Sequence, residues 1–233
     1  MFMKKFQNPF KKLTVFEWCL WGVSMTGVLL AFLIPAEKDI PSLIASLIGV
    51  TALIFVAKGM VIGQVLTVAF AIAYGIVSWA QRYYGEMITY LCMSAPMAIS
   101  AIVSWLKHPY KDSGEVKTKR LSAKEWVFLS LAAVIVSVVF YFLLEALGNA
   151  NLIVSTLSVT TSFFAASLTF LRSPYYAIAY AANDGVLIAL WIYSAVSNIS
   201  YLPMVLCFVM FLFNDLYGFY SWKRMEKRQS SEP

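Results

Sequence analysis

Hydrophobic residues fall into eight long runs along the chain, separated from one another by charge, proline or glycine. A run of roughly 17 to 25 apolar residues is long enough for one helix to cross a bilayer. The pattern therefore predicts eight membrane-spanning helices. Only Lys58 and Gly59 separate the short second run from the third, so seven helices with these two fused is the alternative. The runs lie at 13–34, 40–57, 60–80, 86–106, 124–147, 150–171, 174–195 and 201–222.

The distribution of positive charge favours eight helices. If the N-terminus lies in the cytoplasm, 16 of the 18 Lys and Arg residues fall on that side, and only Lys38 and Arg82 fall on the other. An excess of Lys and Arg in cytoplasmic loops is the usual orientation signal of membrane proteins. Because removing one crossing would scramble this bias, we expect eight crossings with both termini in the cytoplasm.

Composition agrees with a membrane protein and narrows the classes of function. The chain is 61% hydrophobic and 13% charged, with a mean hydropathy of +0.74. These values argue against a soluble enzyme, a disordered scaffold, a nucleic-acid binder and a disulfide-rich secreted module. No phosphate-binding loop and no metal-ligand spacing of Cys or His occurs, so neither a cofactor nor a metal site is expected, and ATP-driven transport within this chain is excluded.

The two halves of the chain resemble each other on either side of a polar loop near residues 107–123. Each half ends on a Ser-Trp pair close to a basic residue, at Trp105 and at Trp222. Two three-helix units joined by one linker helix must run parallel, as in sugar transporters of the SWEET type. We therefore expect an all-α membrane protein with an N-terminal helix and a 3+1+3 arrangement. Its parts are residues 1–39 (basic segment and first helix), 40–106 (first repeat), 107–149 (basic loop and linker helix), 150–222 (second repeat) and 223–233 (basic tail).

Two carboxylates lie inside predicted spanning helices. Asp184 follows Asn183 and Asp215 follows Asn214, and each Asp is followed seven residues later by a tryptophan, the first being Trp191. An Asp at the centre of such a helix costs about 2.5–3.5 kcal/mol on insertion and is usually kept for function. Residues seven apart share a helix face. The pattern predicts a site for a flat aromatic ligand with a polar or cationic end; the alternative is that these polar groups only bridge helices.

Other polar and aromatic residues are candidates for the same cavity or its mouth. Tyr180 and Tyr217 lie within a turn of the two Asn-Asp pairs, and Gln64 lies in the third helix. The tryptophans at 105 and 222 fall at predicted membrane edges and are expected to form part of an interfacial belt. Glu17 is expected to extend its carboxylate to the interface. Candidates for a gate at the outer mouth, around the turn at 81–86, are Trp79, Tyr84 and Glu86.

These motifs resemble those of a known family. The runs Phe213–Arg224, Ala182–Trp191 and Tyr84–Met87 are similar to segments of the PnuC family of bacterial nicotinamide riboside transporters, and the resemblance extends over roughly residues 42–228. It implies a SWEET-like fold in the bacterial inner membrane, a homotrimer, and facilitated diffusion with alternating access. It also implies a cytoplasmic kinase that traps the substrate by phosphorylation.

Other functions stay open at this point. Relatives with the same fold carry thiamine, riboflavin or deoxynucleosides, and each of these is an alternative substrate. A proton-coupled symporter, with Asp184 or Asp215 as the carrier of the proton, is a second hypothesis. A membrane enzyme or a receptor that only binds a ring-bearing metabolite is a third, although no catalytic constellation is evident and we expect no enzyme.

Overall fold

The computed structural model describes residues 8–36, 38–80, 84–149 and 151–231. Within this part of the chain it is nearly all helical, and eight helical segments are long and apolar enough to cross a membrane, as the hydrophobic pattern predicted. The spanning segments are α1 (Val15–Leu33), α2 (Ile40–Ala57), α3 (Val61–Ala80), the fourth segment (Tyr84–Lys107), α6 (Ala123–Ala146), α7 (Leu152–Phe170), α8 (Tyr176–Ser197) and α9 (Leu202–Ser231).

The fourth spanning segment is interrupted. It consists of α4 (Tyr84–Ile88), a π-helical stretch (Thr89–Ser94) and α5 (Ala95–Lys107). π-Helical turns inside α-helices are rare and often occur at functional sites. The change in winding alters which side chains point inward. The hydrophobic pattern of the sequence does not predict this change.

The turn between α2 and α3 shows why these helices are not fused. Gly59 has a φ of +65°, a left-handed conformation that glycine adopts without a steric penalty. Its N–H donates to Val56 O at 2.8 Å, and Met60 N donates to Phe55 O at 3.0 Å. This pair of bonds is the Schellman arrangement that ends a helix. The chain therefore reverses here, and the seven-helix alternative is wrong.

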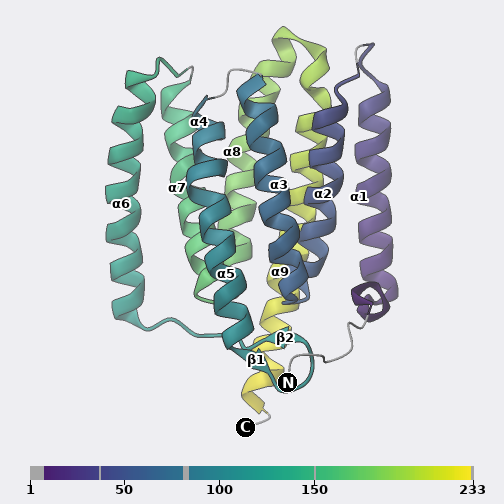
Figure 1. Ribbon diagram of the computed structural model, residues 1–233, viewed down its shortest axis with the longest axis vertical. Helices are drawn as coiled ribbons and strands as arrows, with labels where there is room; N and C mark the ends of the chain where they lie inside the picture. The colour runs from purple at the N-terminus through teal and green to yellow at the C-terminus, as the bar shows by residue number, and fades with distance from the viewer. Residues whose placement is uncertain (1–7, 37, 81–83, 150, 232–233) are drawn as a thin grey trace.

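Six of the spanning segments form a closed ring. In order around it, α2 packs against α3, α3 against α5, α5 against α7, α7 against α8, α8 against α9, and α9 against α2. The other two lie outside the ring at its flanks, α1 against α2 and α9, and α6 against α7 (Figure 1). Both flanking helices begin with a capping box, Thr14 with Glu17 in α1 and Ser122 with Glu125 in α6.

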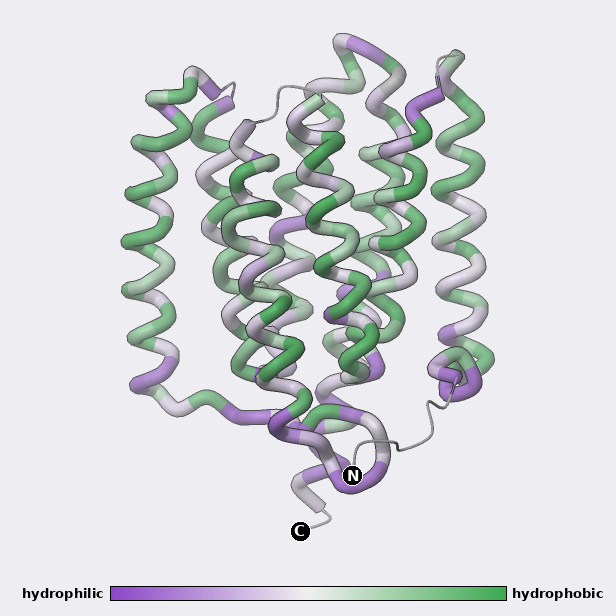
Figure 2. The backbone as a smooth tube through the Cα atoms, in the orientation of Figure 1, coloured by the Kyte–Doolittle hydropathy of each residue, from purple (hydrophilic) through white to green (hydrophobic). Residues whose placement is uncertain are grey.

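The two ends of the bundle differ in polarity. The first and last described residues lie at one end, together with a short antiparallel hairpin of β1 (Pro109–Tyr110) and β2 (Glu115–Val116) (Figure 1). Hydrophilic residues gather there, as Figure 2 shows, and we call it the basic end. At this end α9 continues as a helix to Ser231, so residues 223–231, which we expected to be a tail, are helical.

Candidate functional site

A cavity lies inside the six-helix ring. Its lining residues surround about 640 Å³ of space without protein atoms, part of which is open to solvent. Every segment of the ring contributes to its lining: Gly49, Ala52, Leu53, Val56, Gln64, Thr67, Phe70, Ala71, Tyr90, Ser94, Ser162, Tyr180, Asn183, Asp184, Phe211 and Asp215. The ring thus brings together residues that are up to 166 positions apart, Gly49 and Asp215 (215 − 49).

Two carboxyl groups meet in this cavity. Asp184 on α8 and Asp215 on α9 are each 3% exposed, both line the cavity, and they are close enough to interact electrostatically. When two neighbouring buried carboxyl groups share one proton, the pair carries a single negative charge. Oδ2 of Asp184 has no hydrogen-bond partner among the described residues. Asp184 therefore offers an unused acceptor to a ligand.

The side chain of Asn183 bridges two helices and also lines the cavity. Its Oδ1 accepts hydrogen bonds from three hydroxyls of α7: Thr161 at 2.8 Å, Ser162 at 3.0 Å and Ser158 at 3.4 Å. These bonds tie α8 to α7, as the helix-bridging alternative proposed. Because Oδ1 is engaged in this way, the amide nitrogen is the part of Asn183 that can serve a ligand.

Further polar groups complete the lining. Gln64 on α3 is 2% exposed and faces the same cavity, and Tyr180 lines it one turn before Asp184. Both were expected from the sequence. Ser94 adds a hydroxyl from the π-helical stretch. Amides and hydroxyls of this kind can bind the hydroxyl groups of a sugar.

The aromatic wall of the cavity consists of residues that the sequence reading missed. The ring of Phe70 lies 5.8 Å from that of Tyr90, at an interplanar angle of 87°, and 5.4 Å from that of Phe211, at 65°. Phe211 precedes Asp215 by one turn on the same face of α9, a spacing that could have identified it. Tyr90 points inward from the π-helical stretch, whose position no pattern in the sequence indicates.

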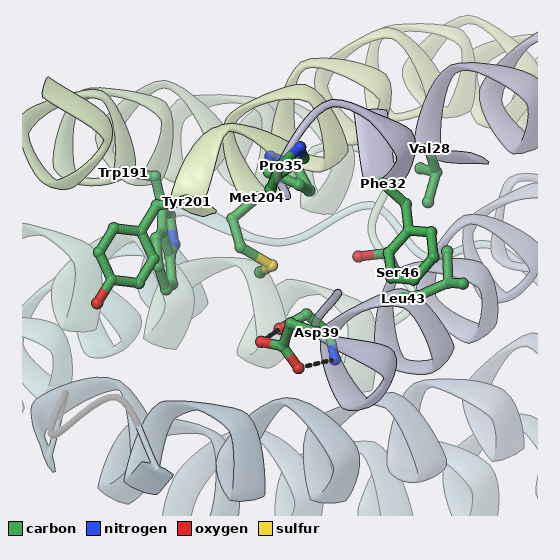
Figure 3. Close-up of a pocket in the computed structure, with 11 residues that line it drawn as sticks. Val28, Phe32, Pro35, Asp39, Leu43, Ser46, Trp191, Tyr201 and Met204 are labelled. Carbon is green, nitrogen blue, oxygen red and sulfur yellow. Dashed lines mark hydrogen bonds between the residues drawn. The ribbon is translucent and has the colours of Figure 1, made fainter. Parts of the chain in front are cut away.

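Trp191 lies beyond this cavity, toward the end opposite the basic one. It is completely buried, its indole N–H donates to the hydroxyl of Tyr74 at 3.1 Å, and its ring lies 5.8 Å from that of Tyr201. Figure 3 shows it beside Tyr201 in a second cavity, which Asp39 and Met204 also line. The structure therefore does not bring Trp191 and Asp184 to one cavity.

Trp222 lies on the other side of the carboxyl pair from Trp191. Helices α8 and α9 run in opposite directions. The seven residues from Asp184 to Trp191 therefore lead away from the basic end, whereas the seven residues from Asp215 to Trp222 lead toward it. Each step is about 10.5 Å. The repeated spacing therefore places one tryptophan at each end of the cavity.

Trp105 and Trp222 do not form an interfacial belt. They are 1% and 0% exposed, their rings lie 5.4 Å apart, and Tyr176 lies 4.8 Å from Trp222. Their indole N–H groups donate to backbone carbonyls inside the bundle. These three residues form what we call the basic-end layer, and Tyr74, Trp191 and Phe208 form the opposite-end layer.

Two other expected residues face α1 and do not line the central cavity. Asn214 Nδ2 donates to Ser24 Oγ at 2.9 Å, and Tyr217 OH donates to Glu17 Oε1 at 2.8 Å. Glu17 also pairs with Lys58 Nζ at 3.2 Å and is 1% exposed. The expectation that Glu17 reaches the interface is therefore wrong, since it anchors α1 to α9 and to the turn after α2.

The gate candidates differ in their exposure. Trp79 is 63% exposed on the outside of the bundle, and Tyr84 is 37% exposed. Glu86 is buried beside Ser158, and neither of its carboxylate oxygens has a hydrogen-bond partner of normal geometry among the described residues. The rest of the expected mouth, residues 81–83, lies outside the described residues.

A ring of spanning helices around a largely apolar cavity that contains a few buried polar groups, with aromatic layers toward both ends, is typical of a membrane transporter. Residues 39–224 match the family model described as nicotinamide mononucleotide transporter, and the chain belongs to this transporter family.

Named relatives agree with this assignment. The nicotinamide riboside transporter PnuC of Neisseria mucosa is 28% identical over 194 residues, which cover 81% of this chain and 74% of that protein. PnuC of Haemophilus influenzae is 25% identical over 189 residues, covering 80% of each chain. A crystal structure of the vitamin B3 transporter PnuC superimposes with a TM-score of 0.82 at 26% identity, covering 93% of this chain and 94% of that one.

Proposed function

We propose that this protein carries nicotinamide riboside across the membrane. The observation that supports this substrate is the charge of the cavity: the described residues that line it include Asp184 and Asp215 but no Lys, Arg or His. The riboside consists of a cationic pyridinium ring on a neutral ribose, which suits one negative charge in a water-poor cavity. The mononucleotide adds a phosphate, which would be buried against carboxyl groups without a cation to pair with it.

Different lining residues contact different parts of the ligand. The single charge of the Asp184–Asp215 pair attracts the pyridinium ring, and the aromatic wall of Phe70, Tyr90 and Phe211 packs against its flat face. The amides of Gln64 and Asn183 and nearby hydroxyls donate to or accept from the ribose.

Transport proceeds by facilitated diffusion with alternating access. The cavity lies between the basic-end layer and the opposite-end layer, so each layer has to open in turn. The α2–α9 and α5–α7 contacts correspond to each other if α2, α3 and α5 form one repeat and α7, α8 and α9 form the other. This correspondence supports two parallel repeats, the arrangement in which one half rocks against the other around a fixed site.

The basic end faces the cytoplasm of a bacterium, across its inner membrane. The support is the concentration of Lys and Arg at the end that holds both described termini. A cytoplasmic kinase that phosphorylates the riboside would then keep it from leaving, because the cavity does not suit a phosphate. The homotrimer implied by the family stays a prediction.

Counterflow tests the transport step. Proteoliposomes that contain only this protein and are preloaded with unlabelled riboside should take up labelled riboside rapidly, with no ion gradient and no ATP. Binding without exchange would instead indicate a receptor and would refute transport. Thiamine, riboflavin and deoxynucleosides in the same assay test the other substrates carried by this fold.

Proton coupling is the second candidate, because a buried carboxyl pair can bind and release a proton together with the ligand. Initial uptake should then depend on the proton gradient at a fixed pH on the substrate side. We expect no such dependence if the carrier is a uniporter.

A further inference from the structure

Two turns at the basic end are built alike. The turn after α2 contains Gly59 at φ +65°, and the turn after α7 contains Arg172 at φ +62°. Arg172 N donates to Thr169 O at 3.0 Å and Ser173 N to Leu168 O at 2.9 Å, the same two bonds that end α2. Arg172 holds a backbone conformation that is uncommon without glycine, and such strain persists only where the surrounding structure maintains it.

Each turn is held by a tryptophan from the neighbouring helix of the ring. Trp222 Nε1 on α9 donates to Val56 O at 2.9 Å, in the last turn of α2. Trp105 Nε1 on α5 donates to Thr169 O at 3.0 Å, in the last turn of α7. The two bonds cross the α2–α9 and α5–α7 seams of the ring, and the two indoles contact each other between them.

The loop before α6 connects the same two turns. Val116 N donates to Gly59 O and Lys119 N donates to Arg172 O, both at 2.9 Å. Three residue steps separate Val116 from Lys119, and three steps of fully extended chain span at most about 11 Å. The two turns cannot move much farther apart than this segment allows while both bonds remain.

The C-terminal end of α9 holds this loop by hydrogen bonds and an ion pair. Gln229 accepts from Thr118 N at 2.8 Å and Thr118 Oγ1 at 3.0 Å, and its Nε2 donates to Val116 O at 3.0 Å. Arg120 pairs with Glu226 at 3.0 Å. The helical extension of α9 therefore holds the loop across the basic end.

We propose that residues Val116–Lys119 form a strap that ties the two turns together and, with the indoles of Trp105 and Trp222, keeps the basic end of the cavity closed. Opening at this end requires that the strap releases one turn and that the indole bonds across the seams break. The strap is thus a built-in closing device of the carrier. The inference rests on the proposed transport function, because a gate has meaning only for a carrier.

Removing one backbone donor tests the strap. Lys119→Pro deletes the N–H that bonds Arg172, whereas Lys119→Ala keeps it; both variants lose the contact of the Lys119 ammonium with Glu125, so they are matched. The reporter is a cysteine at Ala52, in the cavity, in a chain whose three native cysteines are replaced by serine. A membrane-impermeant maleimide is added separately from each side of the membrane to the full-length protein.

From the basic side, Lys119→Pro should label about fivefold faster than Lys119→Ala, the size expected for one lost hydrogen bond, with no increase from the opposite side. Trp222→Phe, which keeps an aromatic side chain but removes the indole N–H, should act in the same direction. Equal labelling of the Pro and Ala variants, or an increase from both sides, would overturn the proposal.

If Lys119→Pro does not fold, Gln229→Ala supplies the same test, since it removes three hydrogen bonds to the strap without altering the backbone. Unchanged labelling in Gln229→Ala would equally overturn the strap. The readout needs no ligand, so its failure is distinct from failure of the proposed function, which riboside binding by the same protein checks.

Discussion

The indole N–H of Trp191 on α8 donates a hydrogen bond to the hydroxyl of Tyr74 on α3, and both side chains are completely buried. The ring of Tyr74 lies 4.4 Å from that of Tyr90, which lines the central cavity. Trp191 is therefore separated from the cavity by the tyrosine it binds. It closes the cavity toward the opposite end, while Phe70, Tyr90 and Phe211 form the wall that a ligand meets.

Trp191→Phe should affect stability more than ligand binding. The substitution leaves the buried Tyr74 hydroxyl without this donor, which costs about 1–3 kcal/mol of unfolding free energy. The riboside Kd should change less than about threefold. Denaturation in detergent and calorimetry measure the two effects, with Tyr193→Phe on the exposed face of α8 as the control. A large loss of affinity at unchanged stability would show that Trp191 contacts the ligand.

Asp184→Asn should distinguish ligands by charge. The side chain keeps its size and hydrogen-bonding capacity but can no longer ionise, so Asp184 Oδ2, unpartnered among the described residues, is lost as a charged acceptor and any negative charge must lie on Asp215. We expect the cationic riboside to bind about 10- to 150-fold more weakly, corresponding to about 1.5–3 kcal/mol for a charged partner. The reduced, neutral form of the riboside should lose much less. Equal losses for both ligands would identify Asp184 as a residue of helix packing, and Asp215→Asn provides the matching measurement on α9.

Gly49→Ala should narrow the central cavity. A Cβ at this position would lie 2.3 Å from Cζ of Phe211 and 3.0 Å from Cδ2 of Phe70, so both rings of the aromatic wall must move. Overpacking of this kind costs about 1–3 kcal/mol, and we expect riboside affinity to fall with it. Gly185→Ala is the control, because nothing lies within 4 Å of its Cβ although it adjoins Asp184. The expectation fails if a thermal-shift titration gives the same Kd for both variants.

Tyr217→Phe should weaken the anchor of α1 and leave the cavity intact. It removes the 2.8 Å bond to Glu17, a loss of about 0.5–1.5 kcal/mol. Glu17→Gln should cost more, because it also leaves Lys58 without its partner. Unfolding midpoints should fall in that order while counterflow of the riboside continues. If Tyr217→Phe abolished binding at full stability, the residue would belong to the ligand site.

The sequence predicted the eight spanning segments because hydrophobic length and charge decide them locally. It also predicted Gln64, Tyr180, Asn183 and the two Asp residues as cavity residues, since polar groups inside such helices have few other places to lie. The roles of Trp191 and Trp222 could not be read from spacing alone. They depend on the opposite directions of α8 and α9, because of which the two copies of the motif place their tryptophans at opposite ends of the cavity.

The strap and the aromatic wall escaped prediction for other reasons. Val116 and Lys119 act through backbone N–H groups, which every residue but proline carries, so their side chains give no signal. Tyr90 depends on a π-helical stretch that leaves the hydrophobic pattern unchanged. Neither feature follows from residue type.

Discrimination between nicotinamide riboside and its mononucleotide tests the central claim most directly. In proteoliposomes containing only this protein, labelled riboside should exchange with internal unlabelled riboside, while external mononucleotide at the same concentration should neither compete nor exchange. That result is predicted because the phosphate would enter a cavity whose described lining carries carboxyl groups and no cation. Exchange of the mononucleotide at a rate similar to that of the riboside would contradict the account.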